Sequence, residues 1–280
     1  MQFTKMHGLG NDFMVLDRTQ QPFELSAEQI QQLANRHTGV GFDQLLVVEP
    51  GQSNQPNESV DFHYRIFNAD GGEAGQCGNG ARCFMQFVHD QGLSDKPRLT
   101  VSTQTGIITL TRINDQIQVD MGIPDFEPAS LPFEASLAEQ HDALYTMTIG
   151  DTEHQFGIVS MGNPHIVFQV QALQALDIAP LGQALQQHPA FPEQVNAGFY
   201  ERLSSGHIRL RVYERGSGET QACGTGACAA VAVGFMQGLL GQQVVVELPG
   251  GQLTIDWQGP GQPLLMTGSA TTVYRGSIEL

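Results

Sequence analysis

Hydrophobic and polar positions follow two periods along this chain, and the changes between them predict the order of its elements. Period-two alternation or a short apolar run indicates a strand, whereas apolar residues three and four apart indicate a helix. The pattern predicts strand, helix, strand and a more apolar second helix, and then the same order again. The first series comprises 13–17, 26–37, 61–69 and 81–92; the second comprises 165–170, 179–188, 207–215 and 226–241. Alternating segments at 98–122 and 244–259 predict further strands.

The first helix carries clear boundary signals. Ser26 is a favoured N-cap residue, and Gln29 three positions later completes a capping box. Thr38 and Gly39 are expected to end the helix.

Three motifs recur in the same order, which predicts an internal duplication. "GNDFMVL" (10–16) resembles "GNPHIVF" (162–168), and "VGFDQ" (40–44) resembles "AGFYE" (197–201). "QCGNGARCF" (76–84) resembles "ACGTGACAA" (222–230). The separations are 152, 157 and 146 residues, which we attribute to loops of different length between equivalent elements.

A break in both periods suggests where the halves join. The proline-rich segment 122–134 is our expected linker. The alternating tail 270–280 has no counterpart in the first half, so we expect it to return there as a strand. The predicted domains are therefore 1–121 plus 269–280, and 122–268.

Composition and charge narrow the class of protein. Hydrophobic residues make up 40% of the 280, enough for a substantial core. The formal charge of −16 argues against nucleic acid or an anionic membrane as a partner. No apolar run of membrane-spanning length is present, and the N-terminus lacks signal-peptide features. We therefore expect a cytoplasmic protein that acts on a small molecule.

The four cysteines all lie in or just after the two glycine motifs. Cys77 and Cys223 precede the predicted apolar helices, where unpaired N–H groups and the helix dipole favour negative charge. We expect each thiol to have a pKa below its usual value of about 8.5. The same N–H groups could hold a carboxylate. Glycines in the motifs would let the backbone approach that ligand: Gly78, Gly80, Gly224 and Gly226.

Two such thiols, one from each half, suit inversion of a carbon acid. One thiolate would remove a proton from one face of the carbon, and the opposite thiol would donate a proton to the other face. Metal binding and dithiol redox chemistry usually use C-x-x-C, which differs from the spacings here. A phosphate loop would carry lysine after the glycines, and none follows. We interpret Cys83 and Cys228, deeper in their helices, as packing residues.

The halves differ in charge beside the cysteines. Asn68-Ala69 in one half corresponds to Glu214-Arg215 in the other, and Arg215 could bind a second carboxylate of the ligand. The alternative is a surface pair at the end of a strand. Polar residues at the other motifs are further candidates, with His165 as one that tunes a thiol: Asn11, Gln44, Asn163, His165 and Asn196.

Long motifs then carry a resemblance to a known family. They are "MHGLGNDF", "GFDQLL", "NADGGEAGQCGNGAR", "MGNPH", "YERGSGETQACGTGACAA" and "LPGG". Together they resemble diaminopimelate epimerases from residue 3 to the tail. The resemblance implies interconversion of LL- and meso-diaminopimelate without pyridoxal phosphate, metal or any other cofactor. It also implies an α/β fold of two pseudo-symmetric domains, each a mixed β-sheet rolled around a central helix.

The same resemblance implies roles for individual residues. Cys77 would take the proton from the LL isomer and Cys223 would supply one. The reacting carboxylate would bind at Gly78, Asn79, Gly224 and Thr225, with Asn11 and Gln44 nearby. The distal amino acid group would meet Asn68, Asn163, Asn196, Glu214 and Arg215. His165 and Glu214 would tune the thiols, and Tyr274 would lie at a homodimer interface.

One position departs from the family pattern, and two other functions remain open. Thr225 stands where the family more often has serine, and a backbone N–H contact would survive that change. A related racemase, such as a proline racemase, would not need the Glu214-Arg215 pair. A thiol oxidoreductase would form a Cys77–Cys223 disulfide during turnover.

Overall fold

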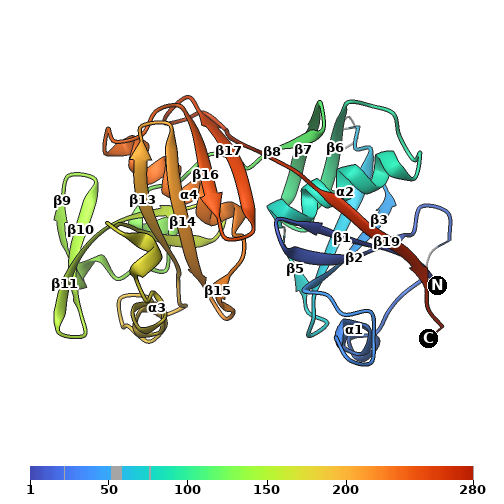
Figure 1. The fold of residues 1–280 in the computed structure, drawn as a ribbon, viewed down its shortest axis with the longest axis horizontal. Helices are drawn as coiled ribbons and strands as arrows, with labels where there is room; N and C mark the ends of the chain where they lie inside the picture. Colours follow the sequence, from blue (N-terminus) through green and yellow to red (C-terminus); the bar gives the residue numbers. More distant parts are fainter. Residues whose placement is uncertain (22, 52–58, 76, 280) are drawn as a thin grey trace. The chain divides into compact units, whose positions relative to one another are not determined.

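A computed structural model describes residues 1–21, 23–51, 59–75 and 77–279 of the chain (Figure 1). The chain forms two compact units: Met1–Asp120 with Thr267–Leu280, and Met121–Met266. The domain limits predicted from sequence differ from these by one or two residues and stay a proposal.

Unit 1 is a mixed sheet with two helices. Its helices are α1 (Ala27–Ala34) and α2 (Gly78–Asp90). Its strands are β1 (Gln2–Gly8), β2 (Asn11–Asp17), β3 (Gln44–Pro50), β4 (Phe62–Asn68), β5 (Glu73–Ala74), β6 (Arg98–Thr103), β7 (Gly106–Ile113), β8 (Gln116–Asp120) and β19 (Thr271–Ser277). Along β1-β2-β3-β4-β6-β7, neighbouring pairs alternate antiparallel and parallel.

Unit 2 repeats this pattern. Its helices are α3 (Ala179–Gln186) and α4 (Gly224–Met236). Its strands are β9 (Glu139–His141), β10 (Leu144–Ile149), β11 (Thr152–Ser160), β12 (Pro164–Gln169), β13 (Asn196–Ser204), β14 (His207–Glu214), β15 (Gly218–Thr220), β16 (Gln243–Leu248), β17 (Gly251–Trp257) and β18 (Leu264–Gly268), the last of which crosses the boundary between the units. Along β11-β12-β13-β14-β16-β17 the pairs alternate in the same order as in unit 1. The topology therefore confirms the duplication.

One helix in each unit is packed inside its curved sheet. α2 contacts β1, β2 and β3 as well as β7 and β8, and α4 contacts β11 to β14 and β17. α4 is apolar nearly all round and almost entirely buried, which a central helix requires because sheet surrounds it. The predicted α/β fold, with each sheet rolled around a helix, is confirmed.

The C-terminal tail returns to unit 1 as predicted. β19 pairs antiparallel with β1, from Gln2 opposite Ser277 to His7 opposite Thr271 (Figure 1). The N-terminal ammonium also donates to the Ile278 carbonyl at 2.7 Å.

Three predictions about local structure were wrong. The segment 122–134 is part of unit 2 rather than a linker, because Leu131 and Phe133 are buried in its core and Phe133 stacks on Phe191.

The first helix begins at the predicted capping box but ends at Ala34. It ends early because the Asn35 side chain accepts hydrogen bonds from the backbone N–H groups of residues 37 and 38.

The third error concerns the middle repeat motif. The strand register makes Gln44 opposite Phe13 equivalent to Asn196 opposite His165. Gln44 and Asn196 are 152 residues apart, as are Phe13 and His165. The match of "VGFDQ" to "AGFYE", which are 157 residues apart, therefore does not join equivalent positions.

Candidate active site

The two cysteines singled out from sequence begin the two central helices. Cys77 is the N-cap residue of α2 and Cys223 is the N-cap residue of α4. Their carbonyls accept the first helical hydrogen bonds, from Ala81 at 2.8 Å and Ala227 at 3.0 Å. All four cysteines are thiols rather than disulfides. The position of each thiol at a helix N-terminus is thus confirmed.

The glycines after these cysteines lie inside the two helices rather than in a separate turn. Gly78, Gly80, Gly224 and Gly226 lie in the first turn of α2 or α4, so the predicted glycine turn is part of the helix. A Cβ atom on Gly80 would lie 2.3 Å from the Tyr64 hydroxyl. Glycine is therefore required where α2 meets β4.

In unit 1, Asn11 and Asn79 form a cluster with Cys77. Its Sγ lies 3.7 Å from Oδ1 of Asn11, the first residue of β2. The same oxygen accepts from Nδ2 of Asn79 at 3.4 Å. Gln44 and Asn68 form a separate pair on β3 and β4, with 2.9 Å from Nε2 to Oδ1.

Sequence reasoning missed Arg82, which supports this cluster. The side chain is buried and donates to Oδ1 of Asn79 at 2.8 Å and to the Ser269 carbonyl at 3.1 Å. An arginine one turn into a buried helix was the available signal, since a buried charge requires polar partners.

In unit 2, a chain of side-chain contacts leads to Cys223. The His165 Nε2 lies 3.0 Å from the Asn163 Oδ1, and the Asn163 Nδ2 donates to the Thr225 hydroxyl at 3.3 Å. That hydroxyl is 3.6 Å from Sγ of Cys223. An amide oxygen only accepts, so the proton of the neutral imidazole is on Nε2. Thr225 thus contributes its side chain, beyond the backbone contact expected from sequence.

The protonation of Cys223 differs from the prediction. Burial raises the pKa of the Cys223 thiol well above its usual value, and the Glu214 carboxylate raises it further. Hydrogen bonds with Thr225 and the Gly226 backbone lower the pKa of Cys223 by less. The predicted lowering was wrong for this cysteine because burial outweighs the helix terminus.

His165 is neutral in the folded protein. It is buried, and burial together with the Arg215 cation lowers the pKa of its imidazole to about 3. Its Nδ1 has no hydrogen-bond partner among the described residues. A neutral imidazole in this position orients Asn163 without adding charge beside the thiol.

Glu214 ends β14 and Arg215 follows it, and each residue makes its own polar contacts. Glu214 accepts a short hydrogen bond from the Thr220 hydroxyl on β15. The Arg215 backbone N–H donates to Oδ1 of Asn196 at 3.0 Å, and its guanidinium donates to the Glu193 carbonyl at 3.3 Å. Asn196 in turn donates to the Pro164 carbonyl at 2.9 Å. Asn196 therefore fixes the backbone at Arg215, while the arginine itself is exposed.

Several predicted site residues lie opposite one another on neighbouring strands, and these cross-strand rows are equivalent in the two units. Across β2, β3 and β4 the row is Phe13, Gln44 and Asn68. In unit 2 the corresponding row is His165, Asn196 and Glu214, the last placed by continuing the β13–β14 register by one residue. The same backbone frame thus carries a neutral row in unit 1 and a charged one in unit 2.

Three further observations concern a second protein chain, a metal ion and a membrane as possible partners. Tyr274 lies on β19 with 46% of its surface exposed, next to the exposed Val273. Among the described residues, no three His, Cys, Asp or Glu side chains form a group that could hold a metal ion. In the part of the chain that the structure describes, no helix is long and apolar enough to cross a membrane.

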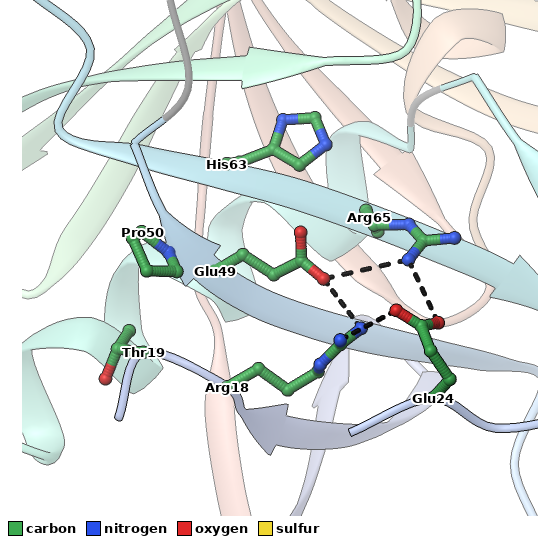
Figure 2. A pocket seen from close by; sticks show the side chains of 7 residues that line it. All are labelled: Arg18, Thr19, Glu24, Glu49, Pro50, His63 and Arg65. Carbon is green, nitrogen blue, oxygen red and sulfur yellow. Dashed lines mark hydrogen bonds and ion pairs between the residues drawn. The ribbon is translucent and has the colours of Figure 1, made fainter. Parts of the chain in front are cut away.

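A hollow of about 440 Å³ in unit 1 involves none of the predicted site residues (Figure 2). Its lining is Arg18, Thr19, Glu24, Glu49, Pro50, His63 and Arg65. Arg18 pairs with both glutamates at 2.8 Å, and Arg65 lies 3.6 and 3.7 Å from them. These charges compensate one another, so we assign the hollow a structural role.

Comparison with known proteins gives the fold and then the family. The fold matches solved structures over nearly the whole chain. One is a hydroxyproline epimerase from Agrobacterium vitis with bound trans-4-OH-L-proline (TM-score 0.67, 17% identity, 99% of this chain and 91% of that one). Another is a probable proline racemase from Agrobacterium radiobacter (0.67, 16%, 100% and 93%), and a third is a PhzF-family phenazine biosynthesis protein from Bacillus anthracis (0.68, 18%, 100% and 99%).

The family itself follows from the sequence. The diaminopimelate epimerase family model matches residues 3–127 and 157–273, which covers both halves of the duplication. The chain belongs to the diaminopimelate epimerase family. It is therefore an isomerase of the epimerase and racemase class.

Proposed function

We propose that this protein interconverts LL- and meso-diaminopimelate by proton transfer between the substrate α-carbon and two thiols, Cys77 and Cys223. The observation that carries the proposal is the equivalence of these thiols, each the N-cap residue of the central helix of its unit. A reaction with mirror-image steps requires one base for each face of the carbon, and a duplicated fold supplies two of the same kind.

The proton transfers balance without an added cofactor. With the LL isomer, the Cys77 thiolate takes the α-proton and becomes a thiol, which leaves a carbanion. The Cys223 thiol donates its proton to the opposite face and becomes a thiolate. The reverse reaction exchanges these roles, and solvent resets the two protonation states between turnovers.

The polar groups around each thiol support this chemistry. The backbone N–H groups at Gly78, Asn79, Gly224 and Thr225 lie in the first turns of α2 and α4, where helix termini favour an anion such as the substrate carboxylate. Charge delocalised from the carbanion onto that carboxylate would be stabilised by the same groups. Asn11 lies beside Cys77, and Gln44 lies on the adjoining row.

The charged row of unit 2 supports a substrate with a second amino acid group. We assign the distal group to Asn68, Asn163, Asn196, Glu214 and Arg215. The exposed Arg215 guanidinium can bind a carboxylate in a bidentate manner, and a carboxylate such as Glu214 can accept from an ammonium. His165 orients Asn163, and Glu214 raises the pKa of Cys223, which keeps that thiol ready to donate.

The assembly and cellular role belong to the same proposal. We assign Tyr274 and Val273, both exposed on β19, to a homodimer interface. The enzyme would act in the cytoplasm, in the synthesis of lysine and cell-wall precursors.

Deuterium incorporation with several substrates tests the function. The purified protein is incubated in D₂O under reducing conditions, without added cofactor, with diaminopimelate, L-proline or trans-4-OH-L-proline. We expect deuterium at one α-carbon of diaminopimelate as its isomers equilibrate, and none in either proline. Deuterium in a proline but not in diaminopimelate would identify a proline or hydroxyproline racemase instead. Turnover that requires a Cys77–Cys223 disulfide would identify a thiol oxidoreductase.

A further inference from the structure

Asp43 and Arg36 are connected to Cys77 through Asn11. Neither residue takes part in a contact described above. Oδ2 of Asp43 accepts from Nδ2 of Asn11 at 3.0 Å and from the Asp12 backbone N–H at 3.1 Å. Its other oxygen accepts from Arg36 at 2.7 Å. Arg36 is anchored independently, since it also donates to both oxygens of Asp12 at 2.8 and 2.9 Å.

These contacts determine which end of the Asn11 amide faces the thiol. A carboxylate only accepts hydrogen bonds, so the NH₂ group of Asn11 must face Asp43 and its oxygen must face Cys77. The same oxygen lies 3.4 Å from Nδ2 of Asn79.

The longer contact with Asn79 favours the same orientation from the opposite end. A guanidinium only donates, so the Arg82 contact of 2.8 Å requires the Asn79 oxygen to face Arg82. The Asn79 NH₂ group is then the end that faces Asn11. Hydrogen bonds therefore run in one direction from Arg82 through Asn79 and Asn11 to Asp43.

We propose that Asp43 is a positioning residue that holds the Asn11 amide oxygen toward Cys77 and so favours the protonated thiol over the thiolate. The inference rests on the proposed function in one respect, because it concerns the thiol assigned there as an acid–base group. If the amide turned, its NH₂ group would face the sulfur and would stabilise the thiolate instead. The carboxylate thus makes Cys77 a hydrogen donor in this contact.

Two substitutions separate hydrogen bonding from charge. Asp43→Ala removes both the charge and the acceptor. Only the longer contact of 3.4 Å with Asn79 then favours the parent orientation, so Asn11 can turn. Asp43→Asn removes the same charge but keeps an oxygen for Asn11 and the Asp12 N–H, with its NH₂ group toward Arg36. Arg36 can release that contact because it retains Asp12.

Asp61 provides a matched control in the same unit. Its carboxylate also accepts from a backbone N–H, that of Thr100 at 2.8 Å, and pairs with Lys96 at 2.6 Å. Asp61→Ala therefore removes the same chemical groups at a position that contacts none of the cluster residues named above.

The measurement is the rate at which iodoacetamide alkylates Cys77 at neutral pH, located by mass spectrometry of the Cys77 peptide. We expect Asp43→Ala to raise the rate about fivefold, which corresponds to the free energy of one hydrogen bond. Asp43→Asn and Asp61→Ala should react like the parent. An unchanged or lower rate in Asp43→Ala would overturn the inference, as would an Asp43→Asn rate as high as that of Asp43→Ala. Because this test measures alkylation and uses no epimerase assay, the inference and the proposed function can fail separately.

Discussion

Gln44 and Asn196 occupy the same position in the two halves of the chain. Gln44 lies opposite Phe13 on the neighbouring parallel strand, and Asn196 lies opposite His165. The two halves therefore share the same backbone arrangement here. The Phe13 ring in one half corresponds to the buried His165 imidazole in the other.

His165→Phe should change how stability depends on pH. The pKa of His165 is lowered from 6.5 to about 3, so the folded protein keeps it neutral while the unfolded chain takes up a proton below pH 6.5. Between pH 6.5 and about 3, the parent should therefore lose about 1.4 kcal/mol of stability per pH unit through this group alone. His165→Phe lacks that loss.

Urea unfolding of both proteins above and below pH 6.5 checks this prediction. The difference in free energy of unfolding, parent minus variant, should fall as the pH is lowered. A difference that stays constant with pH would show that His165 is as easily protonated in the folded state as in the unfolded chain.

Gly80→Ala should destabilise unit 1 through one contact. The added methyl group would lie 2.3 Å from the Tyr64 hydroxyl, and overpacking of this kind costs about 1–3 kcal/mol. The double variant Gly80→Ala/Tyr64→Phe should recover most of that loss, since it removes the clashing oxygen. Gly206→Ala is the control, because its nearest neighbour would be at 3.5 Å. Equal unfolding midpoints for Gly80→Ala and Gly206→Ala would contradict the packing role.

Much of this arrangement could be predicted from the sequence, because its signals are local. The capping box of the first helix and the position of Cys77 before the second depend on neighbouring residues alone. The burial of Phe133 in unit 2 could not be predicted from the segment 122–134, because its partners, such as Phe191, are distant in sequence.

Local sequence patterns also predict the candidate active site only in part. The sequence identifies Cys223 as a helix N-cap residue, but the pKa of its thiol depends on burial and on Glu214. Asp43 stands beside the candidate Gln44, yet its role depends on the start of β2, where Asp12 lies 31 residues earlier. Long-range register and burial decide these properties, and a local pattern contains neither.

Arg215→Met should affect substrate binding more than proton transfer. If the guanidinium binds the distal carboxylate, its loss should raise KM for diaminopimelate ~10-fold or more, the value of a charge-assisted hydrogen bond. The variant should fold normally, because methionine keeps the backbone N–H contact with Asn196 and loses only the exposed guanidinium contact with the Glu193 carbonyl. Steady-state kinetics of the parent and the variant measure this, and an unchanged KM would remove Arg215 from the binding site.

Cys83→Ala should retain activity. Burial raises the pKa of Cys83 to about 12, so this thiol does not ionise at neutral pH and cannot serve as a base. Filling its position with a smaller side chain should cost about 1 kcal/mol of stability. Epimerase activity and thermal unfolding measured together check both parts, and loss of turnover in a folded Cys83→Ala protein would refute the packing assignment.

The two-thiol mechanism is tested most directly by inversion of diaminopimelate in D₂O, under reducing conditions, with the parent, Cys77→Ala, Cys223→Ala and Cys83→Ala. General acid–base groups contribute about 10²–10⁴-fold to rate, so each of the first two variants should invert the substrate slower by that factor. Cys83→Ala should match the parent. If Cys77→Ala or Cys223→Ala inverted the α-carbon at the parent rate, with deuterium entering as before, the account of paired thiols would be wrong.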